Sequence, residues 1–183
     1  FTYGQAENRS ARLASHLQNN CGIAKGDLVG VLAMNSTDIL EIQSACARIG
    51  AIFLPLNWRL TVSELTFIVG DADPKILIHD LQFVDEAAAL KNDTSIAITL
   101  QTTGSGAASP YEEAIAGTEP IAEIVDLTHD DVWTIMYTSG TTGLPKGAMN
   151  TYGMAFYNAV NLGVPARITP DSVTLTILPL FHT

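Results

Sequence analysis

One short stretch of the chain holds most of the residues that could do chemistry. Residues 137–149 read YTSGTTGLPKGAM, with four serine or threonine hydroxyls, three glycines and one lysine. Glycines let main-chain N–H groups approach a ligand closely, and consecutive N–H groups form a nest for an anion. Hydroxyls and an ammonium group add hydrogen bonds to phosphate oxygens. We therefore expect a polyphosphate site made of Thr138, Ser139, Gly140, Thr141, Thr142, Gly143 and Lys146.

Two better-known phosphate-binding motifs do not fit this stretch. A P-loop places its lysine between a glycine and a serine or threonine, whereas Lys146 follows Pro145 and precedes Gly147. The Gly-x-Gly-x-x-Gly fingerprint of dinucleotide-binding domains is missing too. P-loop NTPases and Rossmann dehydrogenases therefore lose support. The plainest alternative is a polar, glycine-rich surface turn.

The elements that must position this stretch alternate along the chain. Apolar runs of strand length alternate with helical patterns, which favours an α/β fold with a mostly parallel sheet and helices on both faces. Capping boxes begin two of the helices, at Thr2 and Thr61. Residues 101–118 break the rhythm and are predicted to be a surface excursion. We predict strands at 28–34, 51–56, 75–80, 95–100, 132–138 and 172–181, and helices at 2–22, 38–50, 61–70, 84–91 and 154–163.

The phosphate stretch follows the predicted strand 132–138 and precedes the predicted helix 154–163. Ligands of open α/β sheets bind beyond the carboxyl ends of the strands. The order of elements along the chain therefore supports a ligand site at this place.

Composition restricts the class of protein. The 183 residues are 47% hydrophobic and 15% charged, with a formal net charge of -10, which argues against a nucleic-acid surface. The low charge content predicts exposed apolar surface through which the chain self-associates. Cys21 and Cys46 have no paired spacing and are expected to be reduced thiols. With neither an apolar run of membrane length nor a leader, the expectation is a soluble, cytoplasmic protein.

Four segments together resemble the adenylate-forming (AMP-binding) superfamily of acyl- and aryl-CoA synthetases, luciferases and peptide-synthetase adenylation domains. YTSGTTGLPKG resembles the phosphate-binding signature of that family, and TYGQAENRSARLA resembles its opening helix. GAIFLPLNWRLTVSEL resembles its second conserved block, and LPLFH at residues 178–182 resembles the block after the phosphate loop. The order and spacing agree, so the resemblance spans essentially all 183 residues.

The resemblance implies a reaction and its participants. PLNWRL and PLFH look like the CoA-ligase branch, acting on a fatty or aryl carboxylic acid, with a preference for a fatty acid; peptide-synthetase adenylation is a further alternative. ATP would activate the acid as acyl-AMP, Mg²⁺ would bridge phosphate oxygens, and coenzyme A would take the acyl group. By this resemblance Lys146 and the hydroxyl-rich loop hold the phosphates. His182 would orient and stabilise charge beside the reacting carboxylate and the α-phosphate.

The same resemblance leads us to expect an incomplete enzyme. The chain starts at Phe1 and stops at Thr183, ahead of the family's adenine, ribose and metal-binding segments and its C-terminal domain. We expect residues 1–183 to be the N-terminal portion of the large domain, divided into 1–127 and a phosphate-loop part at 128–183, and inactive alone. Thr151-Tyr152 departs from the family's usual Thr-His or Ser-His pair. A non-catalytic nucleotide-binding or interaction module is the alternative from another class.

Other polar residues are expected to have structural roles. His16 and His129 have no neighbouring set of metal ligands, and we expect them to be solvated or capping. His79 ends an apolar strand and is expected to be a packed or partly exposed imidazole. Trp58 and Arg59 are expected to hold a loop against the following helix. Glu112 and Glu113 are expected to be a solvated pair on the surface, and Asp126, Asp130 and Asp131 to be turn and edge charges.

Overall fold

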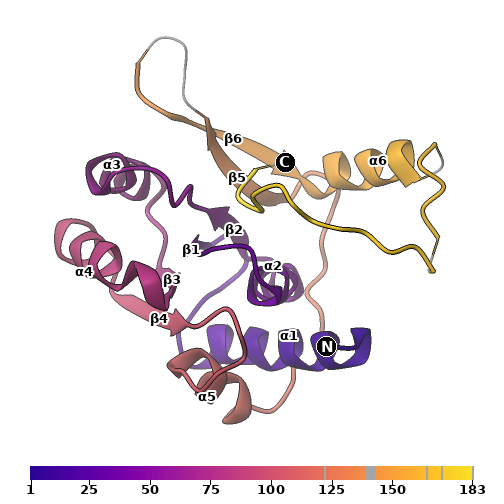
Figure 1. Cartoon of the computed structure of the whole chain (residues 1–183), viewed down its shortest axis with the longest axis horizontal. Coiled ribbons are helices and arrows are strands. Elements are labelled where there is room, and N and C mark those ends of the chain that lie inside the picture. The colour runs from indigo at the N-terminus through magenta and orange to yellow at the C-terminus, as the bar shows by residue number, and fades with distance from the viewer. Residues whose placement is uncertain (122, 139–142, 164, 170, 183) are drawn as a thin grey trace.

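A six-stranded sheet organises the molecule in the computed structural model, which describes residues 1–121, 123–138, 143–163, 165–169 and 171–182. The strand order is β4-β3-β1-β2-β5-β6 (Figure 1). Neighbouring strands from β4 to β5 are parallel, and β6 is antiparallel to β5. The strands are β1 (Leu28–Leu32), β2 (Ile52–Pro55), β3 (Ile76–Asp80), β4 (Ile98–Thr102), β5 (Val132–Thr138) and β6 (Lys146–Thr151).

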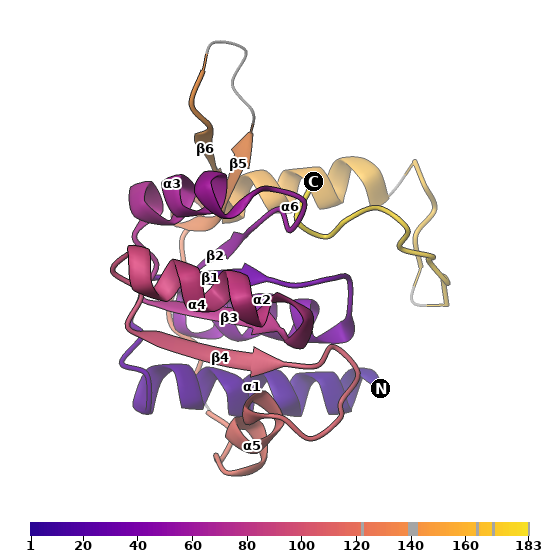
Figure 2. The ribbon, with the colours of Figure 1, turned by 60° about the vertical axis from the view of Figure 1, so that its left-hand side comes forward.

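Helices cover both faces of the sheet, as the sequence predicts. One core packs α1, α2 and α5 against one face, and a second core packs α3 and α4 against the other (Figure 2). Parallel strands need such double cover because both of their faces are apolar. The helices are α1 (Tyr3–Asn19), α2 (Thr37–Ile49), α3 (Val62–Ala72), the short 3₁₀ helix η1 (Leu81–Phe83), α4 (Val84–Asp93), α5 (Pro110–Ala116) and α6 (Tyr152–Gly163).

Local sequence signals start and stop these helices. Both predicted capping boxes are present, at Thr2 before α1 and at Thr61 before α3. Gly50 ends α2 in the left-handed conformation, with φ of 69°. A Cβ at this position would lie 2.8 Å from Lys25 Cγ, so the turn into β2 requires glycine for space as well as for conformation.

The predicted surface excursion at 101–118 is wrong in part, because it contains α5. Tyr111 in this helix is fully buried and its hydroxyl donates to the carboxylate of Glu41 at 3.1 Å. Glu112 is not a solvated partner of Glu113, because it forms a two-pronged ion pair with Arg9 at 2.6 and 2.8 Å. The Gly, Ser and Thr content of the segment concealed a short helix that begins at a Ser109 cap.

The predicted strand at 172–181 is also not formed. Val173, Leu175 and Ile177 alternate as strand residues do, yet they are 99%, 84% and 76% exposed. A strand needs a hydrogen-bonded neighbour, and in the described part of the chain no strand pairs with this segment. The alternating pattern of this segment is therefore typical of a strand, but the segment has no neighbouring strand to pair with among the described residues.

The structure contains no helix, among the described residues, that is long and apolar enough to cross a membrane. Cys21 and Cys46 are free thiols, as predicted. Burial raises the pKa of the Cys46 thiol to about 12, so this side chain packs as a small apolar group.

Candidate active site

The candidate site lies at the carboxyl ends of three adjacent parallel strands. The order β1-β2-β5 places the connections that follow these strands next to one another at the same edge of the sheet. Asn35 follows β1, Trp58 and Arg59 follow β2, and the phosphate stretch follows β5. Parallel topology therefore assembles groups that are about a hundred residues apart in the chain, as expected for an open α/β sheet.

The phosphate stretch is the end of a β-hairpin and not a loop that leads directly into a helix. β6 runs antiparallel to β5 with Thr138 opposite Lys146 and Tyr137 opposite Gly147, and α6 begins only after β6. The two strands project beyond the other strands of the sheet (Figure 1). Antiparallel pairing therefore fixes the Lys146 backbone directly across from the first hydroxyl of the stretch.

The structure describes only some of the predicted binding residues. Gly143 has φ of 135°, in a region that L side chains rarely adopt, which agrees with the predicted role of glycine in this turn. Thr138 and Lys146 are exposed at the two ends of the hairpin strands. The predicted residues Ser139, Gly140, Thr141 and Thr142 lie outside the described residues.

Contacts with α3 hold the hairpin near the loop end of its two strands. The hydroxyl of Tyr137 donates a hydrogen bond to the carboxylate of Asp71. Burial, followed by this bond and the charge of Asp71, raises the pKa of Tyr137 well above its usual range. Ile135 and Tyr137 pack against the apolar core beneath α3. The hairpin is thus held to a buried part of the molecule, a contact that the sequence did not reveal.

One cavity of about 500 Å³ brings the hairpin and His182 together. The hairpin contributes five lining residues, Tyr137, Thr138, Gly143, Leu144 and Pro145, and the 178–182 segment contributes His182. The remaining lining comes from the β2–α3 connection and from α3, through Asn57, Leu60, Glu64 and Ile68. Lys146 follows directly after Pro145 and is exposed, but it is not among the residues that line this cavity.

The Glu64 carboxylate in this wall is already engaged. It accepts hydrogen bonds from the Thr61 N–H at 2.8 Å and from the Thr61 hydroxyl at 2.7 Å. These bonds lower the pKa of Glu64, with the main-chain bond contributing most. Glu64 therefore serves the cap of α3. The described residues contain no group of three or more His, Cys, Asp and Glu that could hold a metal ion.

His182 ends a short turn that follows the extended segment. The main-chain N–H of His182 donates to the Pro179 carbonyl at 3.1 Å. The centroid of its ring lies 5.1 Å from that of the Phe181 ring. Phe181 is 7% exposed, whereas His182 is exposed at the cavity. Trp58 and Arg59 contact Phe181 and thereby hold this turn, and do not simply pack their loop against α3 as the sequence predicted.

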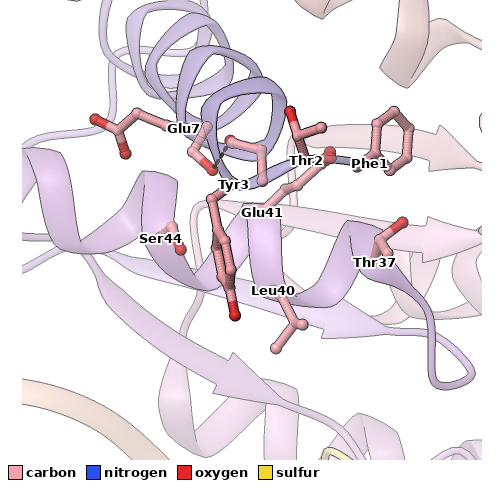
Figure 3. Close-up of a pocket in the computed structure, with 10 residues that line it drawn as sticks. Phe1, Thr2, Tyr3, Glu7, Thr37, Leu40, Glu41 and Ser44 are labelled. Atoms are coloured by element: carbon pink, nitrogen blue, oxygen red, sulfur yellow. Dashed lines mark hydrogen bonds between the residues drawn. The ribbon is translucent and has the colours of Figure 1, made fainter. Parts of the chain in front are cut away.

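A second cavity, of about 350 Å³, lies between α1 and α2 (Figure 3). Glu7 and Glu41 are among its lining residues, and no lysine or arginine is. Both carboxylates have arginine partners, Arg48 for Glu7 and Arg9 for Glu41. An acidic cavity without a free cation does not suit a phosphate, so the hairpin cavity is the better candidate for the predicted chemistry.

The other histidines have structural surroundings. His79 is buried at the end of β3, where Nδ1 lies 3.1 Å from the Asp80 carbonyl oxygen, and burial lowers its pKa. Burial also lowers the pKa of His16. His129 stacks on Phe156, with the ring centroids 5.7 Å apart. His79 is therefore the packed imidazole that the sequence predicts, whereas the stacking of His129 on Phe156 differs from the solvated or capping role that we expected for it.

Comparison with known proteins finds similarity over the whole chain, and the similar proteins belong to the family that the sequence motifs indicate. The family model described as AMP-binding enzyme matches residues 1–183. The chain is 40% identical over 182 residues to a feruloyl-CoA synthase of Amycolatopsis sp, which covers 100% of this chain and 34% of that protein. It is 33% identical over 209 residues to a medium/long-chain-fatty-acid–CoA/3-oxocholest-4-en-26-oate–CoA ligase of Mycobacterium marinum, covering 100% of this chain and 38% of that protein.

Solved structures show the same fold. The ATP-bound crystal structure of MatB from Rhodopseudomonas palustris superposes with a TM-score of 0.86 at 33% identity, covering 98% of this chain and 35% of that chain. The chain therefore spans about a third of the length of the proteins that it matches.

Proposed function

The chain belongs to the AMP-binding enzyme family, and from this membership we propose that the protein containing it activates a carboxylic acid with ATP and transfers the acyl group to coenzyme A. One observation carries the proposal beyond the family match. The glycine-rich hairpin and His182, which are distant in sequence, line the same cavity at the carboxyl edge of the sheet. Such an edge is where α/β folds bind their ligands.

The chemistry explains why these residue types are needed. A carboxylate oxygen attacks the α-phosphorus of ATP, the bond from that phosphorus to the β-phosphate oxygen breaks, and acyl-AMP and pyrophosphate form. The thiol of coenzyme A then attacks the acyl carbonyl and AMP leaves, while the thiol proton passes to solvent. Negative charge develops on the departing pyrophosphate, so donors placed at the β- and γ-phosphates stabilise the transition state.

We assign the phosphate contacts to the hairpin. Thr138 and Lys146 are paired at the ends of the two hairpin strands, and Thr138 and Gly143 line the cavity. The segment 139–142 between them supplies the remaining hydroxyl and N–H donors. A lysine bond to a phosphate oxygen is charge-assisted and contributes about 1.5–3 kcal/mol. We expect the Lys146 ammonium to contribute more to phosphate binding than any other single group of the stretch.

His182 is proposed to face the reacting carboxylate and the α-phosphate. Its exposed side chain lines the same cavity as the hairpin. An acid with a pKa near 4 is already ionised at neutral pH and needs no base. We therefore propose that the imidazole orients the carboxylate and stabilises charge, and does not remove a proton.

Mg²⁺ accompanies ATP in reactions of this kind, bridging phosphate oxygens. The described residues do not form a metal site of their own, because no group of three or more His, Cys, Asp and Glu gathers among them. We therefore assign no residue of the described chain to the ion. Residues 128–183 are proposed to form the phosphate-loop part of the domain, with 1–127 as the first α/β part.

The acid is proposed to be hydrophobic, with a fatty acid as the first candidate. The similarity to a medium/long-chain-fatty-acid ligase supports this assignment. The similarity to a feruloyl-CoA synthase favours an aryl acid as the second candidate. Apolar side chains of Leu60, Ile68 and Leu144 line the cavity, which suits either class better than a small polar acid.

The test is acid-dependent release of pyrophosphate by the full-length protein. Incubation with ATP, Mg²⁺ and a panel of fatty and aromatic acids should release pyrophosphate with at least one of them, and added coenzyme A should convert the product to a thioester. The 183-residue chain alone should release none above background. If no acid in the panel stimulates release by the full-length protein, the proposal of a ligase gives way to a non-catalytic nucleotide-binding module.

A further inference from the structure

We infer that Asn35, in the connection between β1 and α2, is a positioning residue that holds the His182-bearing turn against the sheet. This inference rests on the proposed function for the role of His182, but the contact itself stands on the geometry. Asn35 is far from the phosphate motif in sequence and belongs to none of the segments that suggested the family. The inference therefore adds a residue to the site.

The side-chain amide of Asn35 forms two hydrogen bonds with the main chain of residues 178–180. Its Nδ2 donates to the Leu178 carbonyl at 2.7 Å, and its Oδ1 accepts from the Leu180 N–H at 2.8 Å. One planar side chain thus satisfies an acceptor and a donor two residues apart, much as a neighbouring strand would. The amides of asparagine and glutamine present a donor and an acceptor side by side in one plane, and glutamine is one methylene longer.

The residues just before this segment make few contacts with the sheet. Residues 172–177 pair with no strand in the described part of the chain, and Leu178 is 73% exposed. Leu180 packs against the first core, and the two bonds from Asn35 are the hydrogen bonds that fix the main chain on both sides of residue 179. Asn35 itself is well placed, because β1 ends in the fully buried Leu32 and α2 begins two residues after Asn35.

An aromatic cluster holds the next residue of the turn. The ring of Phe181 meets Trp58 edge to face, with centroids 6.3 Å apart. The Arg59 guanidinium lies 4.9 Å from the Trp58 centroid and 5.8 Å from that of Phe181. Trp58 also stacks on Phe83 at 6.4 Å, which ties the cluster to the core under α4. Such contacts favour one orientation of the rings.

His182 therefore directly follows a segment that is fixed by contacts from two different connections, β1–α2 and β2–α3. Asn35 fixes residues 178 and 180 from the end of β1, and Trp58 with Arg59 fixes residue 181 from the end of β2. A shift of a reacting group by about 1 Å can cost a hundredfold in rate. Loss of the Asn35 bonds should thus lower turnover without removing any group that touches the substrates.

The contact is tested first in the 183-residue chain, by hydrogen exchange of the Leu180 amide. Asn35→Ala should speed exchange in the peptide that contains Leu180 about five- to tenfold, the effect of losing one hydrogen bond of typical strength. Asn35→Asp keeps the acceptor for the Leu180 N–H but sets a carboxylate oxygen against the Leu178 carbonyl, so its exchange should lie between those of the wild type and Asn35→Ala. Asn19→Ala is the matched control, because Asn19 donates to Ser15 within α1. Equal exchange in Asn35→Ala and wild type would overturn the inference.

The consequence is tested in the full-length protein, by acid-dependent ATP–pyrophosphate exchange. Asn35→Ala should lower kcat about ten- to a hundredfold while KM for ATP and the unfolding midpoint stay close to the wild type, and Asn35→Asp should recover part of the loss. An unchanged kcat, or a loss matched by Asn19→Ala, would overturn the positioning role. A full-length wild type without any exchange would instead refute the proposed function, and the amide result would still decide whether Asn35 holds the turn.

Discussion

The ring of Tyr137 lies against Gly147 on the opposite strand of the β5–β6 hairpin, so closely that a Cβ at position 147 would be 3.1 Å from Tyr137 Cζ. The same Cβ would lie 3.0 Å from Cγ2 of Ile135. Both neighbours pack on the core beneath α3, and Tyr137 is tied to Asp71. Because Gly147 has no side chain, β6 can pair with β5 while the Tyr137 ring, which is held by Asp71, lies against it.

Gly147→Val should destabilise the hairpin by about 1–3 kcal/mol, the usual cost of overpacking a filled space. Thermal or denaturant unfolding measures this loss. Ala148→Val on the same exposed strand is the matched control and should change stability by less than about 0.5 kcal/mol. In the full-length protein, Gly147→Val should also lower acid-dependent pyrophosphate release. Stability equal to that of the control would show that the ring gives way and that no close packing exists.

A buried ion network near α1 should dominate the stability of the first core. The Arg9 guanidinium bonds Glu41, whose side chain is 2% exposed, and Glu112, and the Glu41 carboxylate also accepts from the Tyr111 hydroxyl. Arg9→Ala leaves the Glu41 carboxylate buried without its cation, which should cost about 3–5 kcal/mol of unfolding free energy. Arg12→Ala, which removes bonds to Asn8 and to the Thr118 carbonyl, should cost about 1 kcal/mol. Equal losses in the two variants would contradict this ranking.

Stability should fall as the pH drops below about 6.5. Burial lowers the pKa of His79 and of His16 from the ordinary value of 6.5, so the unfolded state binds these protons first. Above this value both states are neutral and the free energy of unfolding is flat with pH; below it, stability is lost as pH falls toward the folded-state values. Denaturant unfolding at pH 7.5 and 5.5, where carboxylates stay ionised, measures the difference. His79→Gln should reduce the slope, and a rise in stability toward pH 5.5 would contradict the assignment.

The 183-residue chain should self-associate through the surface of α6 and the segment after it. Exposed large apolar side chains are concentrated there, and exposed apolar surface of this extent promotes association between copies. The side chains are Met154, Phe156, Tyr157, Val160, Leu162, Val173, Leu175, Ile177 and Leu178. Sedimentation velocity should show a mass that rises with concentration, and Leu175→Glu should reduce it. A monomer at every concentration in the wild type would refute this prediction.

The sequence predicted the part of the fold that depends on local signals. The five parallel strands have continuous apolar runs, and Thr2 and Thr61 announce the helices that they cap. Lys146–Thr151 carries no such run, because β6 lies at the sheet edge with its residues largely exposed. The segment 172–181 has the strand period but no neighbour to pair with. Pairing is a property of the three-dimensional arrangement, so period alone could not decide either case.

The candidate site was predictable to the same degree. The hydroxyls, glycines and lysine of the hairpin and the histidine after Phe181 stand out by residue type, and the structure places Thr138, Gly143 and His182 around one cavity. Asn35 and Asp71 did not stand out, because a lone polar residue in a connection or at a helix end has many possible roles. Their partners, Leu180 and Tyr137, lie far away in sequence.

The most direct measurement compares the affinity of the full-length protein for ATP and for AMP, in the wild type and in Lys146→Ala. If the hairpin grips the β- and γ-phosphates, Lys146→Ala should weaken ATP binding about ten- to a hundredfold, as expected for one charge-assisted bond, and should leave AMP binding within about twofold. ATP affinity that does not change, or an equal loss for ATP and AMP, would contradict the claim that this stretch holds the departing pyrophosphate.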